Sequence, residues 1–216
     1  MGPLALSLQI AVLSTLLAGT TTLALIAVTH GKRIAGAVDA VITAPLVLPP
    51  TVLGYYLLTV LGRRSALGGF WESITGSSFV FTRTGAVIAA TITALPLVLQ
   101  SARAAIDAVD PVLLDAARTL GATRISALAR VALPLASRGV AAGLLLGFAR
   151  ACGDFGVTLM LAGNIPGETQ TAALALYDAV LAGREDDARM LAVALTAIAV
   201  VLIASVQWLG RRPHAR

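Results

Sequence analysis

Residues 110–134 read DPVLLDAARTLGATRISALARVALP, a polar stretch with three arginines inside a very apolar chain. Of the 216 residues, 57% are hydrophobic and only 12% are charged, and the mean hydropathy is +0.88. Soluble domains carry about 25% charged residues, so this chain has too little charge to cover a surface in water. We therefore expect an all-α integral membrane protein that forms a single domain over residues 1–216.

Five apolar segments are long enough to cross a membrane, which takes roughly 20 helical residues. They cover residues 4–28, 38–61, 81–100, 139–161 and 190–209. The N-terminus begins MGPLALSLQIAVL, without a basic region or an A-x-A cleavage site. We therefore expect a retained span rather than a signal peptide. Between the spans we expect an external loop at 62–80 with a short helix near Trp71, and an acidic loop at 163–188 with a short helix near Tyr177.

The basic residues predict the orientation of the spans. The net charge of +5 is divided among short clusters between apolar runs, which is typical of membrane topology rather than of nucleic-acid binding. Because lysine and arginine favour cytoplasmic loops, we place the N-terminus outside and the C-terminus in the cytoplasm. Arg63, Arg64 and Arg83 would then lie outside, which counts against this orientation. Ten of the 16 basic residues would lie inside: Lys32, Arg33, Arg103, Arg118, Arg124, Arg130, Arg138, Arg211, Arg212 and Arg216.

Pro45, Pro49 and Pro50 interrupt the second apolar segment. Proline removes a backbone donor and clashes with the preceding turn, so this helix must kink or unwind. Freed carbonyl groups inside a membrane are tolerated only against protein or water. Two interpretations stay open: the bend, with Pro49 and Pro50, lines a transport pathway or gate, or it serves only the contact between helices.

Capping signals divide the stretch that follows residue 109 into two short amphipathic helices. Asp110 followed by Pro111 is a favourable helix start. Gly121 is expected to end the first helix, because glycine adopts the left-handed conformation without strain. Thr123 is expected to cap the second helix. The stretch therefore predicts two helices that meet at a glycine corner.

The same stretch contains D-A-A, three residues, G, nine residues and then V-A-L-P. This pattern resembles the loop shared by the inner-membrane permeases of ATP-binding-cassette importers, where E-A-A, G and I-x-L-P stand at the same spacing. The resemblance implies the type I importer permease fold, with a cytoplasmic coupling loop at 101–138 that inserts into a cleft of an ATPase subunit and returns to the membrane at its V-A-L-P end. Aspartate in place of glutamate keeps the charge but shortens its reach. The matching residues are Asp115, Ala116, Ala117, Gly121, Val131, Leu133 and Pro134.

Further segments resemble the molybdate branch of this family. They are APLVLPPTVLGYYLL followed by GRR, DAARTLGATR with VALPL, FARACGDFG and NIPGETQT. The resemblance implies a permease that passes an oxyanion into the cytoplasm, with molybdate favoured and sulfate, thiosulfate or tungstate as alternatives. It also implies a homodimer with the pathway at its interface, two copies of an ATPase subunit, and an extracytoplasmic substrate-binding protein, all assembled in the cell membrane.

Arg150 and Asp154 lie four residues apart in the fourth apolar segment, which places them on one face of a helix. Charges inside a bilayer are costly and usually face protein or a water-filled cavity. Arg150 would then line the anion pathway or its gate with Asp154 as its partner. Alternatively, the two residues form a structural ion pair, or the helix breaks at Gly153 and Gly156.

The chain lacks the G-x-x-x-x-G-K-[ST] motif, so we expect it to hydrolyse no ATP itself and to be a transport subunit rather than an enzyme. It shows no catalytic triad and no metal-ligand cluster, and we expect no cofactor; the lone Cys152 allows no internal disulfide. The rival class is an ion-coupled secondary transporter. That class needs intramembrane ionisable groups or an inverted repeat, and the sequence offers only the Arg150/Asp154 pair.

Overall fold

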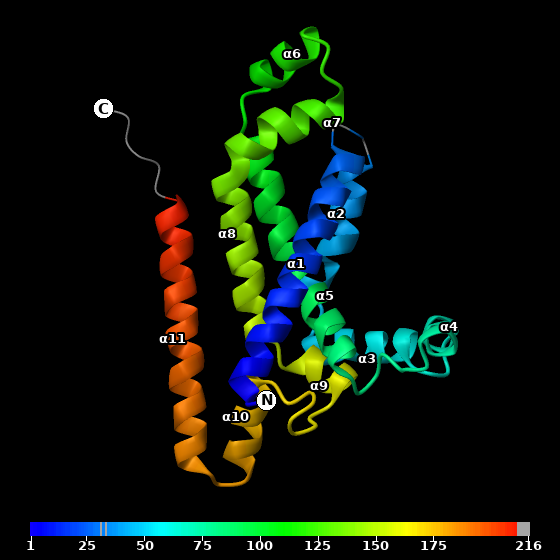
Figure 1. Cartoon of the computed structure of the whole chain (residues 1–216), viewed down its shortest axis with the longest axis vertical. Coiled ribbons are helices and arrows are strands. Elements are labelled where there is room, and N and C mark those ends of the chain that lie inside the picture. The colour runs from blue at the N-terminus through cyan, green and yellow to red at the C-terminus, as the bar shows by residue number, and fades with distance from the viewer. Residues whose placement is uncertain (31, 33, 211–216) are drawn as a thin grey trace.

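The computed structural model of the chain describes residues 1–30, 32 and 34–210 and is an elongated bundle of helices (Figure 1). No strand occurs among these residues, so the expected all-α architecture is confirmed. The helices in chain order are α1 (Pro3–Thr29), α2 (Ala35–Thr43), the 3₁₀ turn η1 (Ala44–Leu46), α3 (Pro50–Leu61), α4 (Ala66–Thr75), α5 (Arg83–Asp107), α6 (Pro111–Thr119), α7 (Arg124–Ala127), the π-helical turn η2 (Leu128–Ala132), α8 (Leu133–Cys152), α9 (Gly156–Ala162), α10 (Ala172–Leu181) and α11 (Glu185–Gly210).

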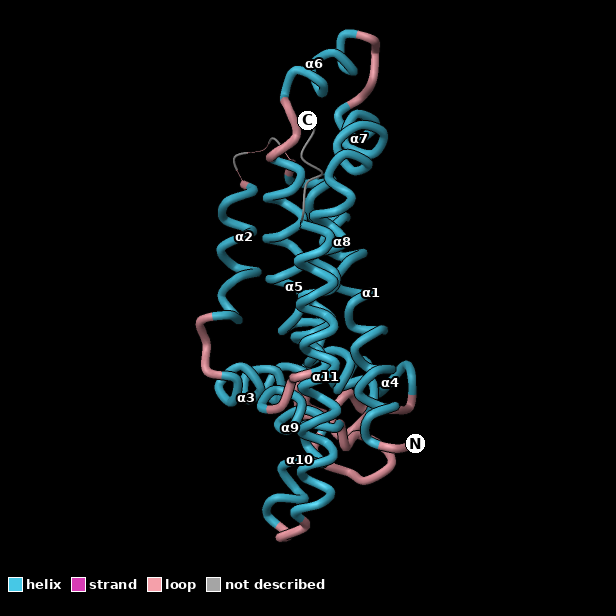
Figure 2. Tube along the Cα trace, turned by 90° about the vertical axis from the view of Figure 1, so that its left-hand side faces the viewer, coloured by secondary structure: helices cyan, strands magenta, loops and turns pink. Residues whose placement is uncertain are grey.

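Helices α1, α5 and α8 lie side by side and form the centre of the bundle (Figures 1 and 2). Small residues let these helices approach closely: Ala94 and Ala102 of α5 are fully buried. A Cβ atom added at Gly147 of α8 would lie 2.4 Å from Val98 Cγ2 of α5. Because lipid offers no hydrophobic driving force, membrane helices associate through such close van der Waals contact. The glycines and alanines of the apolar segments therefore shape the core.

Among the described residues, four helical stretches are long and apolar enough to cross a membrane: α1, α5, the continuous stretch 124–152 and α11. The predicted span at 38–61 is different. It is broken into α2 with η1 and then α3, which are bent by 111° relative to one another. Pro49 and Pro50 lie at this break, as their missing backbone donors require. Counting the bent pair as one span gives the expected five; otherwise there are four.

Three spans have boundaries that differ from the prediction. Helix α5 continues to Asp107 instead of ending near residue 100. The fourth helix already begins at Arg124 and ends at Cys152, so the expected span at 139–161 is wrong at both ends. The last helix begins at Glu185 rather than at residue 190 because Glu185 and the two following aspartates occupy its first turn, where acidic groups are stabilised by the helix dipole.

Two short helices in the connecting loops were predicted correctly. Helix α4 contains Trp71, which stacks on Phe79 at a ring distance of 4.5 Å, and α3 and α4 extend sideways from the bundle (Figure 1). Helix α10 contains Tyr177 and lies at the end of the molecule away from α6. Parts of the predicted basic loop (residues 31 and 33) and the basic C-terminal residues 211–216 lie outside the described residues.

Candidate functional site

The glycine corner lies at one extreme end of the molecule, where α6 stands clear of the bundle (Figures 1 and 2). Asp110 begins α6 by accepting a hydrogen bond from the Val112 backbone N–H at 2.9 Å. Gly121 has φ of +88°, the left-handed conformation expected of it, and its N–H donates to the Arg118 carbonyl. The predicted start and end of this helix are confirmed, because caps depend on residues that are neighbours in sequence.

Helix α6 presents most of its surface outward. None of its residues is buried, and Leu114 makes its contact with the core, beside Leu128. Asp115 and Ala116 are exposed, and the Asp115 carboxylate lies 3.4 Å from Arg118 Nη1. An exposed ion pair of this kind contributes about 0–1 kcal/mol to stability. Asp115 and Ala116 are therefore free to meet another surface, whereas Ala117 is half-buried.

The helix after the corner is not a separate short helix, which corrects the prediction. Thr123 caps it as expected, accepting from the Ser126 N–H at 3.2 Å. It then passes through the π-helical turn η2, in which the Leu133 N–H donates to the Leu128 carbonyl, and continues as α8. Pro134 lies in the first turn of α8, and the helix continues through it. A π turn inside an α-helix is rare, and it is one of the recognised features that bend a helix.

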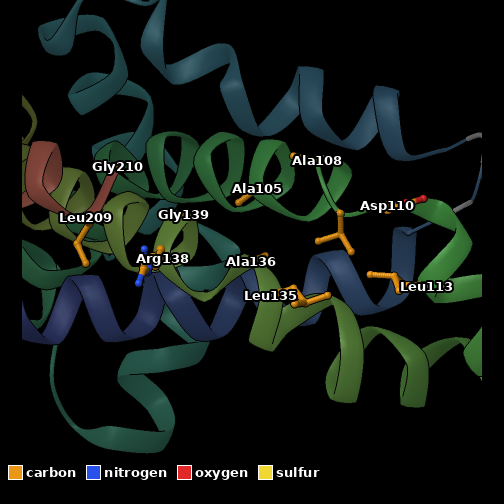
Figure 3. Close-up of a pocket in the computed structure, with 11 residues that line it drawn as sticks. Ala105, Ala108, Asp110, Leu113, Leu135, Ala136, Arg138, Gly139, Leu209 and Gly210 are labelled. Carbon is orange, nitrogen blue, oxygen red and sulfur yellow. The ribbon is translucent and has the colours of Figure 1, made fainter. Parts of the chain in front are cut away.

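A cavity of about 480 Å³ lies behind α6, between the end of α5, the start of α8 and the end of α11 (Figure 3). Its lining is mostly apolar and includes Leu113, Leu135 and Leu209. Arg138 also faces it and forms no hydrogen bond or ion pair with the described residues. The cavity lies between α6 and α11, and α6 contacts the bundle through Leu114, beside η2.

The second group of predicted site residues meets at the other end of the bundle. Helix α3, which follows Pro49, packs against α9, which follows Asp154. A Cβ atom on Gly156 would lie 2.8 Å from Pro50 Cβ, and one on Gly54 would lie 2.6 Å from Met160 Cβ. The two glycines thus allow α3 and α9 to touch. We call these two helices the α3–α9 layer.

The Arg150–Asp154 pair forms as the spacing predicts, with Arg150 Nη1 donating to Asp154 Oδ1 at 3.1 Å. The helix nevertheless ends at Cys152, so the pair joins the last turn of α8 to the turn that precedes α9. Asp154 Oδ2 accepts from both the N–H and the hydroxyl group of Thr158, at 3.0 and 2.5 Å. The Asp154 side chain is 1% exposed and that of Arg150 is 31% exposed. Both structural alternatives, the ion pair and the helix break, are present.

Sequence reasoning missed two residues of these sites. Thr158 completes the hydrogen bonding of Asp154, and its position in the first turn of α9 was the available signal. Arg103 was expected to lie in the cytoplasmic loop, but its side chain points into the bundle and lies 2.6 Å from Asp39 of α2. Nothing in the sequence near Arg103 indicates this direction.

Comparisons with known proteins agree with this architecture. Residues 12–214 match the family described as binding-protein-dependent transport system inner membrane component. The molybdenum transport system permease protein ModB of Escherichia coli K12 is 41% identical over 179 residues, covering 82% of this chain and 78% of the relative. The protein of the same name from Haemophilus influenzae is 39% identical over 85% of this chain and 79% of its own length.

A solved structure has the same fold. In the crystal structure of a bacterial alginate ABC transporter in complex with an alginate pentasaccharide-bound periplasmic protein, one chain superposes with a TM-score of 0.69. The match covers 96% of this chain and 75% of the other, at 19% sequence identity. This chain is therefore a member of the family of binding-protein-dependent transport system inner membrane components, with the fold of an ATP-binding-cassette importer permease.

Proposed function

We propose that the chain is the permease subunit of an ATP-binding-cassette importer that carries molybdate into the cytoplasm, with ATP hydrolysed on a separate subunit. The observation that carries this proposal is the exposed helix α6 with its Gly121 corner, placed at the end of a bundle of membrane helices. The choice of molybdate rests on the similarity to the molybdenum permeases of Escherichia coli and Haemophilus influenzae.

In this proposal α6 is the coupling helix and docks into a cleft of the ATPase subunit. Ala116 is exposed and small, which allows a partner surface to approach the helix backbone closely, and Asp115 offers a negative charge. Gly121 keeps the corner tight. Val131, Leu133 and Pro134 lie where η2 passes into α8. Because the helix is continuous from Arg124 to Cys152, a displacement of the Gly121 corner by the ATPase subunit is transmitted along α8 toward Arg150.

The α3–α9 layer, with Pro49 and Pro50 on one helix and the Arg150–Asp154 pair beside the other, is the proposed gate. The described residues give Asp154 three hydrogen bonds, whereas Arg150 donates one and keeps part of its surface exposed. The exposed part of the guanidinium is suited to attract an oxyanion, since arginine carries several donors in a fixed plane. Two copies of the chain would enclose the pathway, and movement of the ATPase subunits would shift the pair between inward- and outward-open states.

The proposed topology has the N-terminus outside and the coupling end in the cytoplasm. Helix α1 begins and α11 ends at opposite ends of the bundle (Figure 1), which supports an odd number of crossings. An extracytoplasmic substrate-binding protein would then deliver the anion at the end that carries the α3–α9 layer and α10. Sulfate, thiosulfate and tungstate are the alternative cargoes.

Uptake by cells or vesicles tests the proposal. A complex purified through a tag on this chain should contain an ATP-hydrolysing subunit, and its vesicles should take up molybdate only when ATP and the binding protein are present. Molybdate uptake that continues without ATP and stops when a protonophore is added would identify an ion-coupled secondary transporter instead. Competition by excess sulfate or tungstate identifies the cargo, and sulfate uptake in preference to molybdate would contradict the assignment of molybdate.

A further inference from the structure

Arg103 joins three helices near the end of the bundle that carries α6. Its Nε atom lies 2.6 Å from Asp39 Oδ2 of α2. Its Nη2 atom donates to Thr29 Oγ1 of α1 at 2.7 Å. The Arg103 side chain is only 13% exposed. Because a planar guanidinium holds several partners in a fixed geometry, Arg103 ties α5 to both α1 and α2.

Few other contacts hold helix α2 against the bundle. None of its residues is buried, although Ile42 packs against the cluster that contains Leu99 and Ile106 of α5, and α2 runs along the left edge of Figure 2. An opening of about 510 Å³ lies between the two helices, lined by Gly36, Asp39, Thr43, Gln100, Arg103 and Asp107, among others. Across the part of the chain that the structure describes, the Asp39–Arg103 pair is the one ion pair that joins α2 to another helix.

The far end of α2 leads to the α3–α9 layer through the 111° break at residues 47–49. Val47, within the break, is largely exposed, whereas Leu48 packs against the cluster that contains Leu53 of α3 and Val157 of α9. Helix α3 is fixed to α9 by the close contacts at Gly54 and Gly156. A change in the position of α2 would therefore act on the layer through a hinge.

The near end of α5 leads to α6. Arg103 lies four residues before the end of α5 at Asp107, and Asp110 begins α6. A displacement of α6 therefore moves the part of α5 that carries Arg103. The ion pair itself is incompletely satisfied, since Asp39 Oδ1 and Arg103 Nε are both buried without a hydrogen-bond partner among the described residues. An unsatisfied buried oxygen disfavours the closed arrangement and leaves the pair easier to open.

We propose that Asp39 and Arg103 are positioning residues of the transport cycle. Their ion pair holds α2 against α5 in the conformation seen here and opens in the opposite conformation, so that movement of α6 reaches the α2–α3 break. This proposal rests on the proposed function, because it needs an ATPase that moves α6. It adds a second route from the coupling helix to the gate, beside the continuous helix 124–152.

A reversible cross-link between α2 and α5 tests whether the two helices must separate. Gly36 and Asp107 both line the opening and are exposed, and a Cβ at Gly36 meets no atom within 4 Å. The variant Gly36→Cys/Asp107→Cys leaves Asp39 and Arg103 intact. In the complete complex, a short bifunctional methanethiosulfonate should lower ATP-driven molybdate uptake by at least about tenfold, and a reductant should restore it. The two single-cysteine variants treated in the same way are the controls.

Cross-linked complexes that transport as fast as the reduced ones would overturn the proposal. A role that only stabilises the fold predicts this second outcome, since the cross-link holds the helices where the structure already has them. If the wild-type complex takes up neither molybdate nor sulfate with ATP, the proposed function fails, and the proposed role of the Asp39–Arg103 pair fails with it. The two failures are therefore distinguishable.

Charge exchange supplies a second measurement. Asp39→Asn and Arg103→Gln should each lower uptake about tenfold while the complex still assembles and retains basal ATP hydrolysis, because the substitutions affect how α6 and the gate are linked. The exchanged pair Asp39→Arg/Arg103→Asp should recover at least part of the loss. Single variants that take up molybdate at the wild-type rate would contradict the proposal.

Discussion

Gly156 of α9 lies so close to Pro50 of α3 that a Cβ atom on the glycine would be 2.8 Å from the proline Cβ. Two segments about a hundred residues apart in sequence are thereby held in contact, one beside the helix break and the other beside the Arg150–Asp154 pair. This contact defines the proposed gate, and it depends on the absence of a side chain.

Gly156→Val should therefore separate α3 from α9. Overpacking of a close contact costs roughly 1–3 kcal/mol, so we expect a lower thermal midpoint of the purified complex and molybdate uptake reduced at least about tenfold. Gly36→Val is the matched control, because a Cβ there meets no atom within 4 Å. Equal uptake by the two variants would show that the contact is not needed for transport.

Gly121→Asp should uncouple ATP hydrolysis from transport. Aspartate tolerates the left-handed conformation better than most residues, so the helix corner should still form, but a carboxylate is added to the face that docks on the ATPase. We expect normal insertion, loss of molybdate uptake by about tenfold or more, and ATP hydrolysis that no longer responds to the binding protein. Gly167→Asp is the control, since Gly167 has a similar φ of +78° and equally open surroundings. Unchanged uptake in the Gly121 variant would remove the coupling role of α6.

Asp154→Asn separates the structural role of the Arg150 pair from a role in the pathway. Removing the charge leaves Arg150 without its partner and weakens the hydrogen bonds from Thr158, a loss of about 1–3 kcal/mol. Arg150→Ala should also lose the attraction for the anion. A pathway role predicts that Arg150→Ala raises the molybdate concentration needed for half-maximal uptake, with little change in thermal stability. If both variants affect only stability, the pair is structural. Arg184→Ala, which removes exposed ion pairs, is the control.

Pro134→Ala tests whether the π-helical turn matters for coupling. The substitution restores a backbone donor in the first turn of α8, which allows η2 to return to regular α-helix. The part of the helix before η2 would then rotate relative to α8 and carry the Gly121 corner with it. We expect the variant complex to be as stable as the wild-type complex or more stable. Its rate of ATP hydrolysis in the presence of the binding protein should be several-fold lower than that of the wild-type complex. Stimulation at the wild-type level would mean that the turn has no part in coupling.

The features of α6 and its Gly121 corner that depend on neighbouring residues could be predicted from the sequence. Asp110, Gly121 and Thr123 act on neighbouring backbone groups, and their roles as caps were all predicted. The continuity of the helix through Pro134 was not predicted, because a proline commonly ends a helix and only a π turn avoids that outcome here. The interpretation of the stretch as two separate helices was wrong for this reason.

Local sequence patterns could not predict the contacts between distant segments of the chain. The spacing of Arg150 and Asp154 predicted their ion pair, since residues four apart share a helix face. The partner of Arg103 is 64 positions away, at Asp39, and no local pattern relates the two. The same holds for Pro50 and Gly156, both of which drew attention individually but not as partners. The orientation of the termini and the roles of the site residues stay predictions.

The α3–α9 contact also has a consequence for synthesis of the chain. Helix α3 is complete long before α9 is made, and at roughly 5–20 residues per second the ribosome needs about 5–20 s to supply the missing partner. During that interval the break between α2 and α3 lacks the helix that later covers it, and broken helices are tolerated in a membrane only when shielded from lipid. The nascent permease must therefore keep residues 35–61 beside the insertion machinery, or beside a neighbouring subunit, until residue 162 has emerged.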